Sequence, residues 1–205
     1  MYLTTDIKEA IIVLKKGDII VYPTDTAYAL GAKFSDKKAA ARIYKIKRRP
    51  KGKPLPVIAA SLTMARKFFK FSPQEFMLAK RYWPGPLSLL LQLKFPISNF
   101  QFPILVVVRV PDSEIARKLS RAVGEPIIST SANLSGAGEC YSPKEILRQF
   151  QNHKYQPDLI FDDGRLRRKK PSTIVKVNGD KIEVLRRGPI KIKIPISKLE
   201  IRNKF

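Results

Sequence analysis

The sequence contains very little cysteine or histidine, the two residues that supply most zinc ligands and many catalytic nucleophile–base pairs. Cys140 is the one cysteine and His153 the one histidine. An internal disulfide is therefore impossible, which is typical of proteins of the reducing cytoplasm. His153 lies in the polar stretch 151–154, which predicts an exposed side chain rather than a catalytic base. We expect a cytoplasmic protein with no metal site of its own, because two such residues are too few for zinc.

Long apolar runs are also missing. No run approaches the roughly 20 apolar residues that a membrane-spanning helix needs. Near the N-terminus, Asp6, Lys8 and Glu9 interrupt the apolar residues that the core of a signal peptide would require. The sequence therefore predicts neither a membrane partner nor a secretory leader.

Acidic residues are scarce relative to basic ones. There are 17 Asp and Glu against 40 Lys and Arg, and 40 − 17 gives a formal net charge of +23. Such an excess favours polyanionic partners, namely nucleotides, RNA or an acidic protein face. The alternative is a lysine-rich surface that is merely solvated.

The common phosphate-binding and nucleophile motifs are absent as well. The sequence has no Walker loop, no G-x-G-x-x-G and no G-x-S-x-G. Any phosphate must therefore be bound by other loops and side chains.

What is present is an alternation of helical and strand-like apolar patterns. Helices are expected over residues 6–16, 36–46, 61–69, 72–83, 112–124 and 142–151, with Asp6, Ser61, Ser72, Asp112 and Ser142 as N-caps. Strands are expected over residues 19–22, 55–59, 87–93, 104–110, 127–130 and 158–161, with a hairpin over 172–186. This order predicts an α/β fold: one domain over residues 1–190, with a twisted mixed sheet and flanking helices, and then a basic tail over 191–205.

Two of the predicted strands end in polar clusters. Residues 127–136 run from two isoleucines into Ser129, Thr130, Ser131 and Asn133. Residues 19–22 run into a second cluster of hydroxyl groups with a carboxylate, over residues 23–31. Such side chains suit phosphate, ribose or an amino-acid carboxylate, and open α/β sheets bind ligands at strand ends. The alternative is that these are only polar turns.

Cationic segments form the third feature. Residues 45–54 hold six cations, and we expect a stiff loop because its prolines and glycine disfavour a helix. Residues 165–170 form a second cationic loop. Arg109 differs from these because it lies inside an apolar strand, where it needs a buried anionic partner or a ligand.

Seven motifs, taken together and in this order, resemble one known family. They are Tyr22-Pro23-Thr24-Asp25-Thr26, Lys47-x-Arg49-Pro50, Trp83-Pro84-Gly85-Pro86-Leu87, Val108-Arg109-Val110-Pro111, Ser131-Ala132-Asn133-Leu134-Ser135-Gly136, Pro171-Ser172-Thr173-Ile174-Val175 and Leu185-Arg186-Arg187-Gly188. The sequence is similar to the YrdC-like threonylcarbamoyl-adenylate synthases, in their short, single-domain (TsaC-like) form. The resemblance implies a twisted, mixed α/β sheet with a concave, positively charged surface.

The resemblance also implies a reaction: L-threonine, bicarbonate and ATP give threonylcarbamoyl-adenylate and pyrophosphate. A separate enzyme would then transfer the threonylcarbamoyl group to tRNA. ATP is a substrate, and Mg²⁺ is expected on its phosphates.

The same resemblance assigns roles to individual residues. It implies that Lys47, Arg49, Ser131 and Asn133 are catalytic. It implies ATP contacts from Arg49, Lys53, Ser131, Asn133, Ser142 and Arg186. It implies L-threonine contacts from Thr26, Arg109, Ser129 and Ser172. Three positions depart from many members of the family, which have asparagine, histidine and threonine where this sequence has Lys53, Ile58 and Leu105.

Two other functions stay open from the sequence. One is a module of the same fold that binds tRNA or double-stranded RNA without this activity, which the +23 charge favours. The other is a different carbamoyl transfer on the same scaffold. For the enzyme, we expect only weak tRNA binding through phosphates, because the stacking motifs of common RNA-binding sheets are missing.

Overall fold

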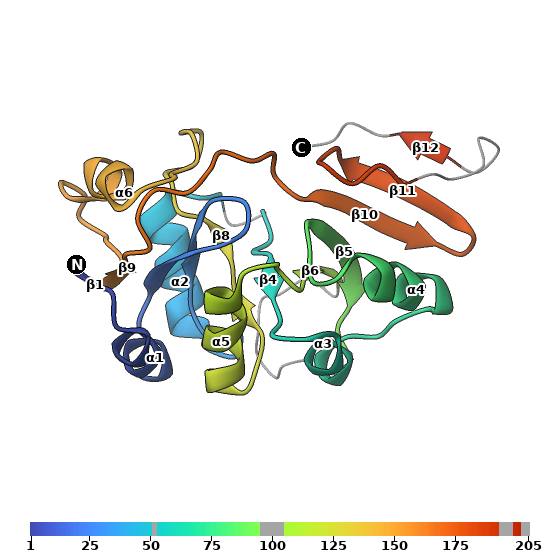
Figure 1. Cartoon of the computed structure of the whole chain (residues 1–205), viewed down its shortest axis with the longest axis horizontal. Coiled ribbons are helices and arrows are strands. Elements are labelled where there is room, and N and C mark those ends of the chain that lie inside the picture. The colour runs from blue at the N-terminus through green and yellow to red at the C-terminus, as the bar shows by residue number, and fades with distance from the viewer. Residues whose placement is uncertain (51–52, 95–104, 193–198, 202–205) are drawn as a thin grey trace.

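The computed structural model describes residues 1–50, 53–94, 105–192 and 199–201. The described helices are α1 (Ile7–Lys15), α2 (Lys37–Lys47), α3 (Leu62–Phe68), α4 (Pro73–Tyr82), α5 (Glu114–Val123) and α6 (Pro143–Phe150). They flank two mixed β-sheets that lie side by side (Figure 1). The predicted α/β class with a mixed sheet and flanking helices is confirmed.

The strands are divided between a smaller and a larger sheet. The five-stranded sheet has the order β1 (Tyr2–Thr4), β9 (Leu159–Phe161), β2 (Ile20–Pro23), β3 (Tyr28–Gly31), β8 (Thr130–Ser131). The seven-stranded sheet has the order β12 (Leu199–Ile201), β11 (Lys181–Arg186), β10 (Thr173–Asn178), β5 (Leu87–Gln92), β6 (Leu105–Arg109), β4 (Val57–Ile58), β7 (Ile127–Ile128). The sequence predicted one sheet, and the structure has two because residues 127–131 leave one sheet and enter the other.

Residues 127–131, called the junction segment below, are shared by both sheets. Ile128 pairs with Val57 in the larger sheet, and Thr130 pairs with Leu30 in the smaller one. Between them, the Ser129 amide donates to the carbonyl of Pro56 over 2.9 Å. The polar residues that follow the predicted strand are thereby placed where the sheets meet.

Helix boundaries follow local sequence signals in most places. Asp6, Ser61 and Ser72 cap α1, α3 and α4 as predicted, and Ser72 forms a reciprocal box with Glu75. The predicted cap of α5 at Asp112 is wrong by one residue, because Ser113 accepts the hydrogen bond from the Ala116 amide. At α6, the N-cap is Ser142 as predicted.

Helix α2 extends further than the sequence predicted. The predicted helix ended at residue 46, but Lys47, expected in the cationic loop, is also helical, and the helix ends where Arg48 takes a left-handed conformation (φ 51°). The predicted breakers, Pro50 and Gly52, come only after that point. As a result Lys47 is held on a rigid element, whereas residues 51–52 of the predicted loop lie outside the described residues.

Two apolar clusters hold the layers together. The smaller one joins α1 and α5 to the five-stranded sheet through buried residues such as Leu14, Leu119 and Tyr22. The larger one joins α2 to both sheets through residues such as Ile43, Leu30 and Leu89. The described residues include no helix long and apolar enough to cross a membrane.

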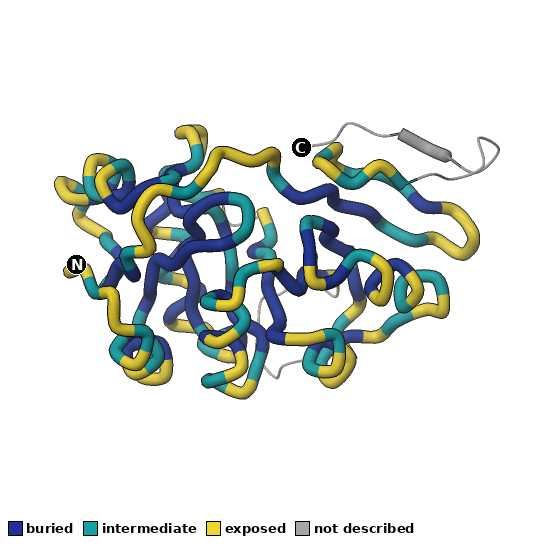
Figure 2. The backbone as a smooth tube through the Cα atoms, in the orientation of Figure 1, coloured by how far each residue is buried: buried dark blue, intermediate teal, exposed yellow. Residues whose placement is uncertain are grey.

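One irregular connection, residues 162–172, runs from β9 in the smaller sheet to β10 in the larger one. It passes over one edge of the molecule, and most of it is exposed (Figures 1 and 2). It carries the predicted cationic loop, Arg165 to Lys170. In the predicted tail, residues 199–201 form the edge strand β12 beside β11, whereas Lys193, Lys198 and Lys204 lie outside the described residues.

Candidate active site

A buried lysine lies beside the junction segment. Lys47, on the last turn of α2, is 2% exposed. Its Nζ atom donates to the carbonyl oxygen of Asn133 over 2.7 Å, to Oδ1 of Asn133 over 3.2 Å, and to the carbonyl oxygen of Ser131. All three acceptors are neutral oxygens, and their number matches the three N–H donors of an ammonium group. The charge of Lys47 therefore has no carboxylate partner among these contacts.

The surroundings of Lys47 disfavour its charged form. Burial lowers the pKa of Lys47 to about 7, and the charge of Arg49 acts in the same direction. Cys140 and Glu139 act weakly against this shift. An added anion would reverse the shift, since an opposite charge favours the protonated amine. Lys47 is thus a buried amine whose protonation depends on the charges placed near it.

Ser131 and Asn133 fix this arrangement. The Ser131 hydroxyl donates to Oδ1 of Asn133 over 2.5 Å. The Asn133 amide group donates to the carbonyl of Leu134 over 3.0 Å and to that of Ala137. The backbone of the turn also returns to the helix, because the Ser135 amide donates to the Lys47 carbonyl over 2.8 Å. Sequence patterns predicted a polar cluster here, and the structure brings Lys47, Ser131 and Asn133 into direct contact.

Arg49 lies next to this cluster but is engaged elsewhere. Its Nε donates to the carbonyl of Lys53 over 3.1 Å, and its Nη2 donates to the carbonyl of Pro54 over 2.9 Å. Burial lowers the pKa of Arg49. Lys53 itself is exposed. Arg49 therefore holds the end of its own loop in the ligand-free protein.

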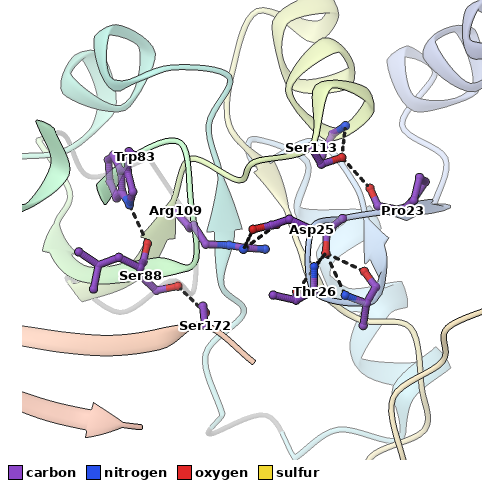
Figure 3. A network of polar contacts seen from close by, with 12 residues as sticks. Pro23, Asp25, Thr26, Trp83, Ser88, Arg109, Ser113 and Ser172 are labelled. Carbon is purple, nitrogen blue, oxygen red and sulfur yellow. Dashed lines mark hydrogen bonds and ion pairs between the residues drawn. The ribbon is translucent and has the colours of Figure 1, made fainter. Parts of the chain in front are cut away.

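Arg109, the cation inside an apolar strand, has a carboxylate partner. Its Nη1 contacts both oxygens of Asp25, over 2.7 and 2.9 Å. The two side chains are 9% and 6% exposed and point toward one another between β6 and the turn after β2 (Figure 3). The sequence required either a buried anion or a ligand for Arg109, and the structure supplies the anion from a position 84 residues away.

The turn after β2 is built around a threonine that sequence reasoning did not single out. The Thr24 hydroxyl donates to the Ala27 carbonyl over 2.6 Å and accepts from the Thr26 and Ala27 amides over 3.2 Å each. It also lies 3.1 Å from the Thr26 hydroxyl. This network fixes Asp25 and Thr26 opposite Arg109 (Figure 3). The signal that could have revealed it is the hydroxyl-rich strand end itself.

Ser172 belongs to a second hydroxyl cluster at the start of β10. Its hydroxyl lies 2.9 Å from that of Ser88 and accepts from Nη2 of Arg186 over 3.0 Å. Partial burial lowers the pKa of Arg186; Glu139 opposes this shift and the charge of Arg109 adds to it. The charge of Arg186 is therefore influenced by Glu139 and by Arg109, while its side chain is held by Ser172.

A cavity of about 290 Å³ opens beside the Arg109–Asp25 pair. Its lining comes from five separate parts of the chain and consists of Asp25, Thr26, Pro86, Asp112, Lys169, Lys170 and Pro189. The absence of a side chain at Gly188 lets the segment before Pro189 approach, because a Cβ there would collide with the backbone of Pro171 and Thr173. The exposed connection 162–172 thus forms one wall of a cavity whose other wall holds Thr26.

Comparisons with known proteins identify the family of this chain. The model of the Sua5_yciO_yrdC family, described as "Telomere recombination", matches residues 12–188. The chain belongs to this family. A protein of Methanocaldococcus jannaschii named putative threonylcarbamoyl-AMP synthase is 33% identical over 183 residues, which cover 89% of this chain and 84% of that protein.

Solved structures of the Sua5/YciO/YrdC family have the same fold. The crystal structure of E. coli YciO matches with a TM-score of 0.78 and 32% identity, covering 94% of this chain and 97% of that one. The structure of P. abyssi Sua5 complexed with L-threonine matches with a TM-score of 0.82 and 32% identity, covering 96% of this chain. This chain spans 58% of that longer protein. The family predicted from the seven motifs is confirmed.

Within this family fold, most of the predicted site residues fall into two groups, and Arg186 belongs with Ser172. Lys47, Ser131 and Asn133 are in direct contact, with Arg49 beside them. Thr26, Arg109 and Ser172 lie on the other side, and Ser129 joins the two through the junction segment. Ser142 is used locally, because its hydroxyl accepts from the Glu145 amide as the cap of α6. The roles of all these residues in binding stay predictions.

The three departures from the family pattern lie in different places. Ile58 pairs with Arg109 in register and is buried in the cluster with α1 and α5. Leu105 lies at the opposite end of β6 from Arg109 and lines a second cavity, of about 390 Å³, with Gln92. Leu105 therefore lies away from the cavity that contains Thr26, whereas Ile58 lies next to the Arg109 strand position.

Proposed function

We propose that this protein is an L-threonylcarbamoyladenylate synthase, a nucleotidyltransferase that uses L-threonine, bicarbonate and ATP. The threonine amine and bicarbonate would form a carbamate with loss of water. A carbamate oxygen would then attack the α-phosphorus of ATP, and the bond to pyrophosphate would break. The observation that carries the proposal is the buried Lys47 ammonium, held by Ser131 and Asn133 without a carboxylate partner.

The Lys47 side supports ATP binding. A cation fixed by neutral oxygens can stabilise charge on the triphosphate and on departing pyrophosphate without prior reorganisation. Arg49, Lys53, Ser142 and Arg186 are the further ATP contacts that we propose. Phosphate oxygens would replace the carbonyls of Lys53 and Pro54 as acceptors for Arg49, so ATP binding would loosen that loop. Mg²⁺ would arrive on the phosphates, and Glu139 is the carboxylate that acts on the charges of both Lys47 and Arg186.

The Arg109 side supports amino-acid binding. Thr26 lines the adjacent cavity, and Ser129 and Ser172 complete the set of proposed L-threonine contacts. The structural relative crystallised with L-threonine is consistent with this assignment. Catalysis would then depend mainly on positioning, with the carbamate placed in line with the α-phosphorus.

The decisive experiment follows the product directly. The purified protein is incubated with ATP, labelled bicarbonate and L-threonine, and the labelled adenylate is separated and identified. Pyrophosphate release is measured in parallel with each substrate left out in turn. Release that continues at the same rate without threonine would exclude the proposed reaction.

A second candidate function is an RNA-binding module without this activity. The exposed cations of the connection 162–172 favour it, because they can contact a phosphate backbone. If the enzyme assignment is right, adenylate synthesis needs no RNA, and tRNA binding is weak, steep in salt and indifferent to whether the tRNA is modified. Synthesis that requires RNA would favour the module.

In the proposed function, a separate transferase in the same cytoplasm would use the adenylate.

A further inference from the structure

The Asp25–Arg109 pair differs from every other ion pair among the described residues. Both of its side chains are under 10% exposed, whereas each of the other pairs has at least one side chain that is more than 35% exposed. Such burial removes most of the screening by water, so the charges act strongly on whatever enters next to them. The pair is neutral as a whole, and a ligand must therefore fit a balanced pair of charges.

Asp25 lies between Arg109 and the cavity. Asp25 and Thr26 line the 290 Å³ cavity, but Arg109 is not part of its lining. Both carboxylate oxygens of Asp25 accept from one nitrogen of Arg109, Nη1. A guanidinium has five N–H donors, so donors remain that Asp25 does not use. A ligand that approaches Arg109 from the cavity meets the Asp25 carboxylate at the same point.

A bare carboxylate is a poor ligand for such a place. Such a ligand would gain hydrogen bonds to the Arg109 cation. It would also bring its negative charge close to the buried Asp25 carboxylate, and like charges at short range repel strongly when water is excluded. A zwitterion avoids this conflict, because its ammonium group can lie against Asp25 while its carboxylate lies against Arg109. The two charge pairs then alternate in sign.

We propose that Asp25 recognises the α-ammonium group of the amino-acid substrate, and that the Asp25–Arg109 pair selects free zwitterionic amino acids before the carbamate forms. This inference rests on the proposed function, which makes L-threonine the amino acid. It adds Asp25 to the binding residues and defines the class of ligand by charge. Ligands that lack either the ammonium or the carboxylate group are disfavoured.

Three ligands of nearly equal size test the proposal on the unaltered protein. They are L-threonine, 3-hydroxybutyrate, which has no amine, and L-threoninol, which has no carboxylate. Binding is measured by calorimetry without ATP or bicarbonate. We expect L-threonine to bind at least about tenfold more tightly than either analogue, the usual consequence of losing one charged hydrogen bond. Binding of 3-hydroxybutyrate within about threefold of L-threonine would overturn the proposal.

The variant Asp25→Asn separates recognition from structure. It keeps the shape but removes the negative charge, so threonine should bind about tenfold or more weakly while 3-hydroxybutyrate binds more tightly than it does to the unaltered protein. A loss of fold would weaken the binding of both ligands. Weaker binding of L-threonine together with tighter binding of 3-hydroxybutyrate, called the crossing below, therefore cannot come from misfolding. Equal changes for both ligands would assign Asp25 a purely structural role.

Asp112→Asn is the matched control, because Asp112 lines the same cavity but is exposed and forms no ion pair with Arg109. It should leave the preference for L-threonine within about twofold. A crossing produced by Asp112→Asn would transfer the role to Asp112 and overturn the inference. A failure of the proposed function would be seen in a different assay: the unaltered protein would make no labelled adenylate, whatever its amino-acid preference.

Discussion

Two buried cations, Lys47 and Arg109, lie on opposite sides of the candidate site and are stabilised in different ways. Lys47 is 2% exposed and Arg109 is 7% exposed. Lys47 donates only to neutral oxygens, whereas Arg109 is paired with the Asp25 carboxylate. When protonated, Lys47 is therefore a buried positive charge with no carboxylate among these contacts, whereas Arg109 belongs to a neutral pair.

This difference shows how one site can suit two unlike ligands. A region with an unbalanced cation attracts a polyanion, and burial, which lowers the pKa of Lys47, makes its charged form depend on such an anion. A balanced pair does not attract a polyanion but can accommodate a zwitterion. The two regions would thus sort triphosphate from amino acid by charge alone.

The largest expected effect comes from breaking the balanced pair. Arg109→Ala should lower the free energy of unfolding by about 3–5 kcal/mol, because Asp25 is left buried without a partner. The measurement is urea denaturation. The double variant Arg109→Ala/Asp25→Ala should lose less than the single one, since it buries no lone charge.

A matched control for that prediction is Arg121→Ala on α5. Arg121 and Glu114 form an exposed pair, 60% and 63% exposed, so the change should cost under about 1 kcal/mol. Equal costs for Arg109→Ala and Arg121→Ala would mean that the buried pair is not a structural element.

Removing the unbalanced cation should affect rate rather than stability. Lys47→Met keeps the apolar stem but loses the charge, and we expect adenylate synthesis to fall about 10²–10³-fold. Asn133→Ala should lower the rate in the same range because Asn133 holds Lys47. Stability to urea should hardly fall. Lys38→Met, an exposed lysine on the same helix, is the control, and a similar loss there would argue against a specific role.

The third prediction concerns pH. The folded pKa of Lys47 is about 7 and its ordinary value is 10.5, so between these values the unfolded chain holds a proton that the folded protein has lost. Stability from this group therefore rises with pH across that window, by up to about 1.4 kcal/mol per pH unit. Urea denaturation at pH 7, 8 and 9 should show this slope, and Lys47→Met should remove it. Parallel curves for the two proteins would show that Lys47 stays protonated.

The smallest effect is expected at the edge of the unbalanced region. Lys53→Asn removes an exposed charge near Arg49, so adenylate synthesis should persist while ATP binding becomes a few-fold weaker and less dependent on salt. The check is the Kd for ATP at two salt concentrations. If neither value changes, Lys53 does not contact the nucleotide.

Features encoded within a few residues were predicted from the sequence, and features that join distant segments were not. The caps Asp6, Ser61 and Ser72 depend on side chains that reach only two or three residues, and they were found. The need of Arg109 for an anion was also found, because an apolar strand cannot satisfy a cation. The identity of Asp25 was not, since the pair spans 84 residues and depends on how β6 approaches the turn after β2.

The same limit applies to the sheets and to Lys47. Strand positions follow from apolar patterns. The division into two sheets depends on which strands pair with residues 127–131, and local sequence patterns do not predict that pairing. Lys47 was placed in a stiff cationic loop because its neighbours are cationic and prolines follow. Its buried position follows from α2 packing beside a turn more than 80 residues away. The site residues were thus predicted as a set, while their division into two charge environments required the structure.

The junction segment has a consequence for how the protein opens. Two consecutive amides of this segment donate in opposite directions: Ile128 to the carbonyl of Ala32, which follows β3, and Ser129 to that of Pro56, which precedes β4, over 2.8 and 2.9 Å. One half cannot unfold while keeping the other intact at this point, since the same five residues serve both. Hydrogen exchange at these amides should therefore occur only when the whole domain opens, in contrast to the exposed connection 162–172. The residues that would hold the substrates are then also the slowest to lose their protection, and the site is preserved for as long as the fold is.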